Sequence, residues 1–471
     1  MIRKLLAATA FLLASASQAA AQPAPPNFPG QAQFRELYKE LIETDTTAEH
    51  GSCTRAAEAM ARRLKSAGYP EADVHLLAPA DRPKDGNLIA VLHGTDAKLK
   101  PVMLLAHIDV VEAKREDWTR DPFTLVEENG YFFARGASDD KAMASSFTDA
   151  MIRYRQEGFK PRRGVQLTLT CGEETPDTFN GVKWLLANHR PMMDAAFALN
   201  EGAGGRLEGD RRIYLGIQAG EKVYQDFAVW ATNPGGHSSR PVKDNAIYRL
   251  AAGLTKLGGY DFPVHINQAT RLHFEKMSAI MGGEMGAAMR AAAGPNPPPE
   301  AIAAISRDPG YNSMMRTTCV ATEISGGHAL NALPQKATAN INCRILPDES
   351  VDDVAHTLAR VMGDPGLKMA ISGERSPVSP PPALTPAILG PAEAVAHQLW
   401  PEVPLVPAMT TGATDGRFML ASGVPTYGLS GMFGEADGGG VHGLNERIPV
   451  RSLYEGREFL YRVVKLYAAA R

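Results

Sequence analysis

Histidines and carboxylates follow several apolar runs of this sequence, and their types suit a metal site. His107 and Asp109 come directly after the run at residues 103–106, and the pair Glu173 and Glu174 follows another apolar run. Because alternate residues of a strand share a face, His107 and Asp109 can point together. The further candidates are Asp139, Glu201 and His442. Histidine and carboxylate ligands without cysteine suit two divalent ions, zinc first and then manganese or cobalt.

The adjacent pair Glu173 and Glu174 favours a division of labour. One carboxylate can bind metal while the other takes a proton from the attacking water. A carboxylate shared between two ions would hold them about 3.5–4 Å apart. Taken singly, each motif is more typical of an ordinary polar pair or a solvated helix start. Their succession at the ends of apolar runs favours a metal site.

Strands and helices alternate in the segments that must position these residues. Residues 87–93, 102–106 and 164–170 are expected as strands, and residues 141–156 as a helix. This alternation predicts an α/β domain with a largely parallel central sheet. In such sheets ligands bind at the carboxyl ends of the strands, which is where the candidate residues stand. Further helices are expected at residues 34–44, 54–67, 387–399 and 452–470.

The pattern changes near residue 219, and a second domain is expected there. A strand at 223–231, a helix at 245–257, strands at 317–324 and 337–345 and a helix at 351–362 follow one another. This is the order of a ferredoxin-like α+β unit. Residues 267–311 are expected to form a helical insertion, and the Pro-dense run 376–386 a linker. The catalytic domain is therefore assigned to residues 22–218 and 378–471, with residues 219–377 inserted as a lid or dimerisation domain.

The first 21 residues have the pattern of a cleavable secretory signal. Arg3 and Lys4 precede an apolar run, and small residues at 19–21 offer a cleavage site. The run is too short to span a bilayer, which disfavours the alternative of an uncleaved anchor. We expect an exported protein, periplasmic or secreted, with no membrane contact after signal removal. The formal net charge of -3 and the scattered basic residues give no reason to expect nucleic acid as a partner.

These motifs resemble, in type and in order, the zinc exopeptidase and deacylase family. That family includes carboxypeptidase G, carboxypeptidase S, acetylornithine deacetylase, succinyl-diaminopimelate desuccinylase and aminoacylase. The matching motifs are His107-Ile108-Asp109-Val110-Val111, Arg135-Gly136-Ala137-Ser138-Asp139-Asp140-Lys141, Gly172-Glu173-Glu174, Asn200-Glu201-Gly202, Gly235-Gly236-His237-Ser238-Ser239, Asn331-Ala332-Leu333-Pro334, the stretch 411–417 and His442. The resemblance covers nearly the whole mature chain. It implies a mostly parallel catalytic sheet with an inserted ferredoxin-like lid.

The resemblance also implies a set of metal ligands. Asp139 would bridge two ions, and family members often have a cis peptide bond after this residue. His107 and Glu201 would complete one metal site. Glu174 and His442 would complete the other. Two divalent ions, most often zinc, are therefore the implied cofactors.

Other roles implied by the resemblance concern catalysis and substrate binding. Glu173 would be the general base, Asp109 would orient a ligand, and His237 from the lid would help hold the oxyanion. Asn331, Arg344 and Gly412 would contact the substrate, with Arg344 holding its free carboxylate. Ala413 departs from the family pattern, in which a second glycine is common. The insertion at 267–311 is larger than in compact members, which puts the usual dimer interface in doubt.

We expect a two-metal amidohydrolase that cleaves an amide bond beside a free carboxylate, as carboxypeptidases and dipeptidases do. The alternative is an N-acyl-amino-acid deacylase, so the substrate is a small peptide or an N-acyl amino acid. The complete ligand set disfavours an inactive binding protein. The absence of a Gly-x-Ser-x-Gly motif disfavours a serine hydrolase. A homodimer through the lid domain remains a further hypothesis.

Two of the cysteines allow a disulfide hypothesis. Cys319 and Cys343 fall on expected strands on either side of a turn at 326–334. If these strands form a hairpin, the two cysteines lie at similar distances from its middle. An oxidising compartment would then permit a bond between them. Two buried free thiols are the alternative.

Overall fold

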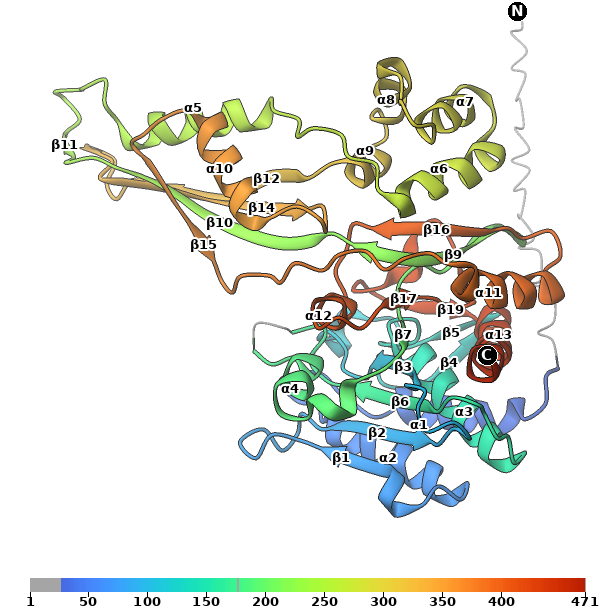
Figure 1. The fold of residues 1–471 in the computed structure, drawn as a ribbon. Helices are drawn as coiled ribbons and strands as arrows, with labels where there is room; N and C mark the ends of the chain where they lie inside the picture. The colour runs from blue at the N-terminus through green and yellow to red at the C-terminus, as the bar shows by residue number, and fades with distance from the viewer. Residues whose placement is uncertain (1–26, 176–177, 471) are drawn as a thin grey trace, which may run out of the picture.

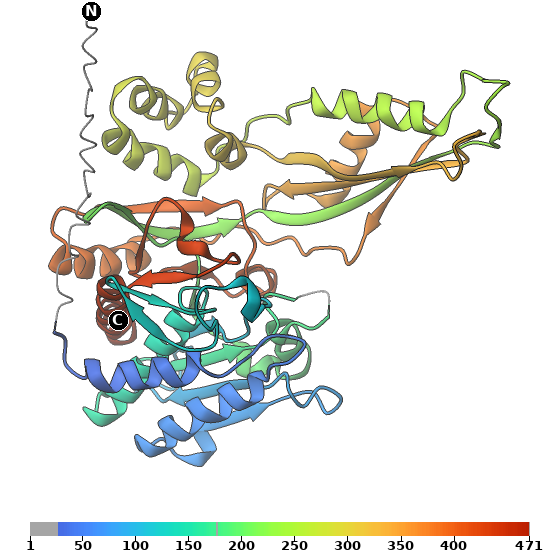
Figure 2. The same ribbon diagram turned by 180° about the vertical axis from the view of Figure 1, so that it is seen from behind.

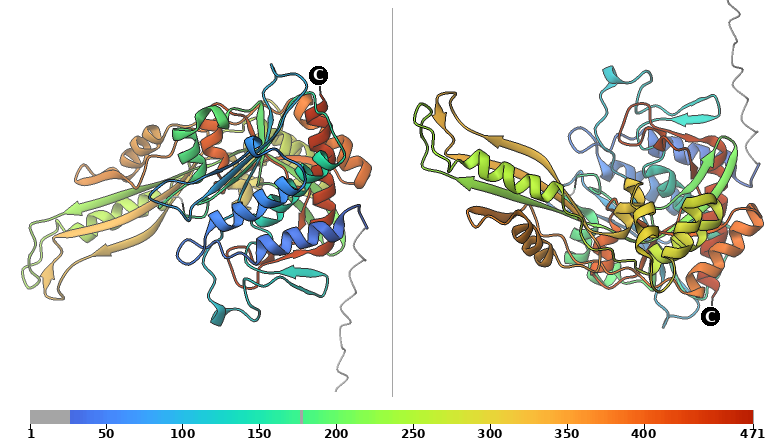
Figure 3. Two further views of the ribbon diagram at one scale, coloured as in Figure 1. Left: turned by 90° about the horizontal axis from the view of Figure 1, so that it is seen from below. Right: turned by 90° about the horizontal axis from the view of Figure 1, so that it is seen from above.

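The computed structural model describes residues 27–175 and 178–470 (Figure 1). The expected signal sequence, residues 1–21, lies outside the described residues. Within the described part of the chain, no helix is long and apolar enough to cross a membrane. The molecule has a large body built on one sheet and a second, smaller sheet that extends from it as an arm (Figures 1 and 3).

The body is built on a ten-stranded mixed sheet. In spatial order its main path is β1 (Val74–Leu77), β2 (Asn87–Leu92), β6 (Val165–Thr170), β3 (Val102–His107), β7 (Phe197–Asn200), β17 (Thr426–Gly428), β9 (Arg211–Glu221), β8 (Gly205–Glu208) and β18 (Phe433–Gly434), and β16 (Leu405–Thr410) pairs with β9. The central strands β6, β3, β7 and β17 run parallel. Strands β3 and β6 are buried at every position, as expected for a parallel sheet covered on both faces.

Helices cover both faces of this sheet. The helices of the body are α1 (Gln31–Ile42), α2 (Cys53–Ser66), α3 (Lys141–Gln156), α4 (Gly181–Asn188), α11 (Pro386–Leu399), α12 (Gly416–Ala421) and α13 (Val450–Ala469). Leu104 and Ala106 of β3 pack into the core with α1, α2, α3 and α13. Met103 and Leu105 of the same strand point into a separate core with α4 and α12. Successive side chains of β3 point to opposite faces of the sheet, so this one apolar strand contributes to two hydrophobic cores.

The arm is a four-stranded antiparallel sheet with two helices, which we call the lid. Its strands lie in the order β12 (Thr318–Gly326), β14 (Lys336–Ile345), β10 (Val223–Thr232) and β15 (Leu367–Ser372), and its helices are α5 (Ala246–Gly258) and α10 (Val351–Met362). Buried positions alternate along β10, because only one face of the sheet packs against the helices. At the tip, β11 (Gly236–His237) pairs with β13 (Ala332–Leu333).

The helical insertion forms between α5 and β12, and it packs on the body. It contains α6 (Gln268–Met281), α7 (Gly283–Ala292), α8 (Pro299–Ile305) and α9 (Pro309–Met315). Its core includes Val406 of β16, and His273 Nδ1 lies 2.9 Å from the Pro407 carbonyl. Figure 2 shows these helices above β9 and β16, beside the lid. The buried Lys222, between β9 and β10, holds the end of α9 by donating to the Ser313 and Arg316 carbonyls at 2.9 and 2.7 Å.

All four cysteines of the chain form disulfides. Cys319 and Cys343 are direct partners across β12 and β14, so the predicted bond is present. Cys53 at the start of α2 joins Cys171 at the end of β6. The sequence analysis did not foresee this second bond, because its cysteines lie 118 residues apart.

Candidate metal centre

Five of the predicted ligands meet at one edge of the central sheet. His107 ends β3, Glu201 follows β7, and Glu174 comes shortly after β6. These strands are parallel neighbours, so their carboxyl ends bring the three side chains together. Asp139 stands in the loop before α3, and His442 in the loop before β19 (Arg447–Pro449).

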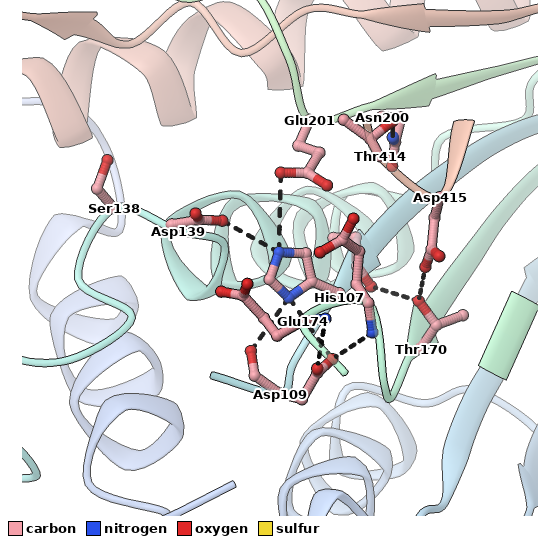
Figure 4. Close-up of polar contacts among 12 residues, drawn as sticks. His107, Asp109, Ser138, Asp139, Thr170, Glu174, Asn200, Glu201, Thr414 and Asp415 are labelled. Atoms are coloured by element: carbon pink, nitrogen blue, oxygen red, sulfur yellow. Dashed lines mark hydrogen bonds and ion pairs between the residues drawn. The ribbon is translucent and has the colours of Figure 1, made fainter. Parts of the chain in front are cut away.

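The two oxygens of Asp139 face two different histidines. Its Oδ1 lies 3.1 Å from His107 Nε2, which is also 3.7 Å from Glu201 Oε2. Its Oδ2 lies 3.2 Å from His442 Nε2, which is 2.9 Å from Glu174 Oε2. Figure 4 shows Asp139 and Glu201 on the same side of the His107 ring. The side chains therefore form two three-ligand groups that share Asp139.

The donor set fits two divalent cations. Three carboxylates crowd together here, and within residues 27–175 and 178–470 their ion-pair partners are imidazoles. Such crowding is costly unless cations are present. Hydrogen bonds to Asp139 and Glu174 raise the pKa of His442 to about 10. Burial raises the pKa of Glu201 to about 7. Both pKa shifts favour a bound proton, as expected where carboxylates and imidazoles cluster without a cation between them. Oxygen and imidazole ligands in this number suit zinc, cobalt or manganese.

Asp109 positions the segment that carries the two adjacent glutamates. Its Oδ1 accepts the Glu173 backbone N–H at 3.2 Å, and its Oδ2 accepts that of Glu174 at 3.0 Å. Its Oδ1 also lies 3.6 Å from His107 Nδ1, on the side away from the ligand nitrogen. Burial, followed by the nearby Glu201 carboxylate, raises the pKa of Glu173 well above its usual range. A carboxylate with a raised pKa beside a metal pair suits a general base.

Glu446 is a buried residue that the sequence analysis missed. Its carboxylate accepts the backbone N–H groups of Gly136, Ser138 and Asp139 at 2.8 to 3.0 Å and a guanidinium N–H of Arg135 at 2.9 Å. It therefore closes the loop that presents Asp139. The Asp139–Asp140 peptide bond is cis, as the resemblance implied.

Asp415 is a second buried acid without an assigned role. It accepts from Thr170 Oγ1 at 3.1 Å and from Asn180 Nδ2 at 2.6 Å. These bonds tie the loop after β16 to the end of β6 (Figure 4). Its place in the stretch 411–417 was the only signal for it in the sequence.

The structure does not bring His237 and Asn331 to the cluster within this chain, which corrects the expectation for a single copy. Both are exposed at the tip of the lid, where Ser238 N–H donates to the Asn331 carbonyl at 3.0 Å. Figures 1 and 2 show that β11 lies at the end of the arm, far from the body. The physical reason is the length of β10, whose ten residues carry the chain outward before the two glycines at 235 and 236.

Arg344 and the loop of Gly412 lie side by side where the lid joins the body. Arg344 Nη1 donates to the Thr411 carbonyl at 3.4 Å, and its guanidinium stacks 4.6 Å from the centre of the Tyr224 ring. The alternative partners do not hold it, because Asp348 pairs with His265 and Glu349 accepts from Thr317. Among residues 27–175 and 178–470, no carboxylate forms an ion pair with Arg344. The Asp226 carboxylate is close enough for its charge and that of Arg344 to shift each other's pKa, but the two form no ion pair.

Comparison with known proteins agrees with this geometry. Residues 103–466 match the family model described as "Peptidase family M20/M25/M40". The chain is 27% identical over 387 residues to mouse N-fatty-acyl-amino acid synthase/hydrolase PM20D1, covering 79% of this chain and 75% of that protein. The fold is similar to an M20 family metallo-carboxypeptidase from Sulfolobus solfataricus, with a TM-score of 0.69, 18% identity and coverage of 93% and 100%. It is also similar to a dinuclear metal binding M20 peptidase from Bacillus subtilis, with a TM-score of 0.59, 12% identity and coverage of 92% and 97%.

Proposed function

We propose, from the premise that the chain belongs to the peptidase family M20/M25/M40, that this metallo-hydrolase cleaves an amide bond next to a free carboxylate. The proposed reaction is of the carboxypeptidase or dipeptidase type. The observation that carries it is the shared Asp139, whose two oxygens each face a histidine and a glutamate. Zinc is the proposed metal, with cobalt or manganese as substitutes.

The chain's own residues divide the work of hydrolysis. Two ions held by His107, Asp139, Glu174, Glu201 and His442 would supply Lewis acidity to the water and the substrate carbonyl. Glu173 accepts a proton from the water as its oxygen adds to the carbonyl carbon. Glu173 then delivers this proton to the amide nitrogen as the C–N bond breaks. Asp109 holds Glu173 in place through the backbone.

Arg344 is the proposed anchor for the free carboxylate. A guanidinium binds a carboxylate through two parallel hydrogen bonds and stays charged at any working pH. The Gly412 loop lies beside it, because Arg344 Nη1 donates to the Thr411 carbonyl of that loop at 3.4 Å. Compounds with a blocked C-terminal carboxylate should therefore be poor substrates. Arg344→Lys should lower kcat/KM, because an ammonium group cannot form the two parallel hydrogen bonds of a guanidinium.

The test compares a free-carboxylate dipeptide with its C-terminal amide, using zinc-loaded protein. The wild type should favour the acid by roughly 10- to 100-fold in kcat/KM, and Arg344→Lys should narrow the difference. Arg375→Lys is the matched control, because this exposed lid arginine pairs with Asp352. Equal kcat/KM for acid and amide in the wild type would show that Arg344 does not bind the substrate carboxylate.

An N-acyl-amino-acid deacylase is the second candidate. It is favoured by the similarity to an N-fatty-acyl-amino acid synthase/hydrolase. Both reactions leave an amino acid with a free carboxylate, so the Arg344 site serves either. A panel of dipeptides and N-acyl amino acids sharing one C-terminal residue separates them, because only the group on the other side of the amide differs.

A homodimer through the lid would complete the site. Strand β12 is an edge strand, and Val320 and Ile324 on it are 60% and 63% exposed. Tyr248 of the neighbouring α5 is 66% exposed. A second copy could cover these side chains and bring its His237 to the cluster. Mixing inactive His237→Ala and Glu173→Gln chains tests this, since activity returns only if His237 acts across subunits.

Export is proposed from the pattern of residues 1–21. The two disulfides support it, because such bonds persist in oxidising compartments. The mature protein from its native host should begin near Gln22, and an intact mass that includes Met1 would count against cleavage.

A further inference from the structure

A cavity of about 440 Å³ opens beside the metal centre. It shares Asp139 and Glu201 with that centre, and its other walls come from α3, β5 (Tyr131–Phe133), β8, β9, β18, β19 and the loop before β19. Neither Arg344 nor Gly412 lines it. If the substrate carboxylate lies at Arg344 and the amide at the metals, this cavity receives the group on the acyl side of the amide.

Two arginines line the cavity, and their surroundings differ. Arg447 is neutralised, because its Nη2 lies 2.9 Å from Glu435 and 2.7 Å from Asp437. Glu435 is further engaged by the Tyr131 hydroxyl, which donates to it at 2.6 Å. Arg206 is half-buried and forms no ion pair with any carboxylate of the described chain. The cavity wall therefore carries one uncompensated cation.

The position of Arg206 in the sheet aims it at the cavity. It is the direct cross-strand partner of Tyr214 in the antiparallel pair β8–β9, and directly opposed residues project from the same face. Both residues line the cavity. Burial raises the pKa of the Tyr214 phenol, while the positive charge of Arg206 opposes this rise. The cross-strand pairing and the shared lining therefore place both side chains on one wall of the cavity.

We propose that Arg206 and the Tyr214 hydroxyl bind a carboxylate at the far end of the acyl group. The preferred acyl groups would then be those of dicarboxylic acids, such as glutaryl. A half-buried guanidinium without a protein anion has given up part of its hydration, and a carboxylate restores the loss through two charge-assisted hydrogen bonds. This inference rests on the proposed function, since it places the scissile amide at the metal centre.

The apolar part of the wall also bears on the alternative that the cavity binds a purely hydrocarbon acyl chain. Met143, Met432 and Phe433 line it and are almost fully buried, so they would pack against the methylene groups of the acyl chain. A purely apolar chain would satisfy these side chains and leave Arg206 facing hydrocarbon. A chain of a few methylenes ending in a carboxylate satisfies both parts of the wall.

The test compares N-glutaryl-phenylalanine with N-(5-methylhexanoyl)-phenylalanine, which has the same shape without the charge. With zinc-loaded wild type, kcat/KM for the glutaryl compound should be higher by roughly 10- to 100-fold. Arg206→Met should abolish this ratio, and Arg206→Lys should keep part of it because the charge remains. Arg211→Met is the matched control, since this exposed arginine on β9 pairs with Glu208 outside the cavity. Zinc content of each variant shows that the centre is intact.

The outcomes separate this inference from the proposed function. A wild type that prefers the hydrocarbon acyl group, or a ratio unchanged in Arg206→Met, overturns the role of Arg206 while leaving amide hydrolysis in place. If neither compound is hydrolysed, the proposed function fails for this substrate class. Calorimetry with glutarate and 5-methylhexanoate then decides the inference: selective glutarate binding lost in Arg206→Met supports it, and equal binding of both acids contradicts it.

Discussion

Replacing Glu446 with glutamine tests whether one buried carboxylate holds the metal centre together. The carboxylate accepts four N–H groups from the segment 135–139, two on each oxygen. A glutamine of the same shape has one oxygen and one NH2 group. Whichever way the amide turns, its NH2 group meets two N–H donors that it cannot accept from.

The magnitude follows from the bonds lost. Two charge-assisted hydrogen bonds at about 1.5–3 kcal/mol each give a gross loss of about 3–6 kcal/mol. Burial raises the pKa of Glu446, so desolvation of the native carboxylate offsets part of this loss. We expect a net effect near 3 kcal/mol, or about 100-fold in an equilibrium constant. The loss is shared between folding stability and zinc affinity, because the loop that Glu446 holds also carries Asp139.

Calorimetric titration of zinc into chelator-stripped protein measures the affinity, and thermal melting measures the stability. Glu446→Asp keeps the charge but shortens the reach, so it should fall between wild type and Glu446→Gln. Glu128→Gln is the matched control, because this exposed glutamate pairs with Arg120 and accepts from Asn129, both away from the metal centre. Two zinc ions bound with wild-type affinity by a Glu446→Gln protein of unchanged melting temperature would refute the reasoning.

Three further predictions concern catalysis, pH and cysteines. Glu173→Gln should retain both zinc ions while kcat falls by about 10²–10⁴-fold; an unchanged kcat would remove Glu173 from the mechanism. Burial raises the pKa of Glu221 from 4.5 to about 7, so between these values the folded state holds a proton that the unfolded state has lost. Stability therefore falls as pH rises through this window, by up to about 3 kcal/mol. Glu221→Gln should make the melting temperature less dependent on pH between pH 5 and 8. If the variant keeps the wild-type slope, the pH dependence of stability does not come from Glu221. Denatured, unreduced protein should show no free thiols, and reduction should release four; two thiols before reduction would exclude either Cys53–Cys171 or Cys319–Cys343.

The sequence predicted the elements around the metal centre well, because strong local patterns mark them. The helix expected at 141–156 has those bounds in the structure, and the buried runs before His107 and after residue 164 form β3 and β6. His107, Glu174 and Glu201 stand at or shortly after the ends of such strands, so their convergence follows from the parallel order of the strands.

Residues whose roles depend on distant contacts could not be predicted in the same way. Glu446 lies in a short polar segment with no periodicity, and only the folded loop shows that it accepts three backbone N–H groups. Cys53 and Cys171 are 118 residues apart and meet only in the folded chain, so no local pattern of the sequence predicts their bond. The motif around His237 identified a residue type but not its distance from the cluster.

The helical insertion has a mechanical consequence for the lid. Because α6 to α9 rest on the body, the chain crosses between body and lid four times instead of two: before β10, after α5, before β12 and after β15. Two crossings leave a hinge axis about which a rigid arm can swing, whereas each added tether removes rotational freedom. One of the crossings is also fastened by Lys222, which binds the end of α9. We therefore expect the arm to turn through a smaller angle than one without the insertion, so that substrate entry depends more on loop and side-chain motion than on swinging of the whole lid.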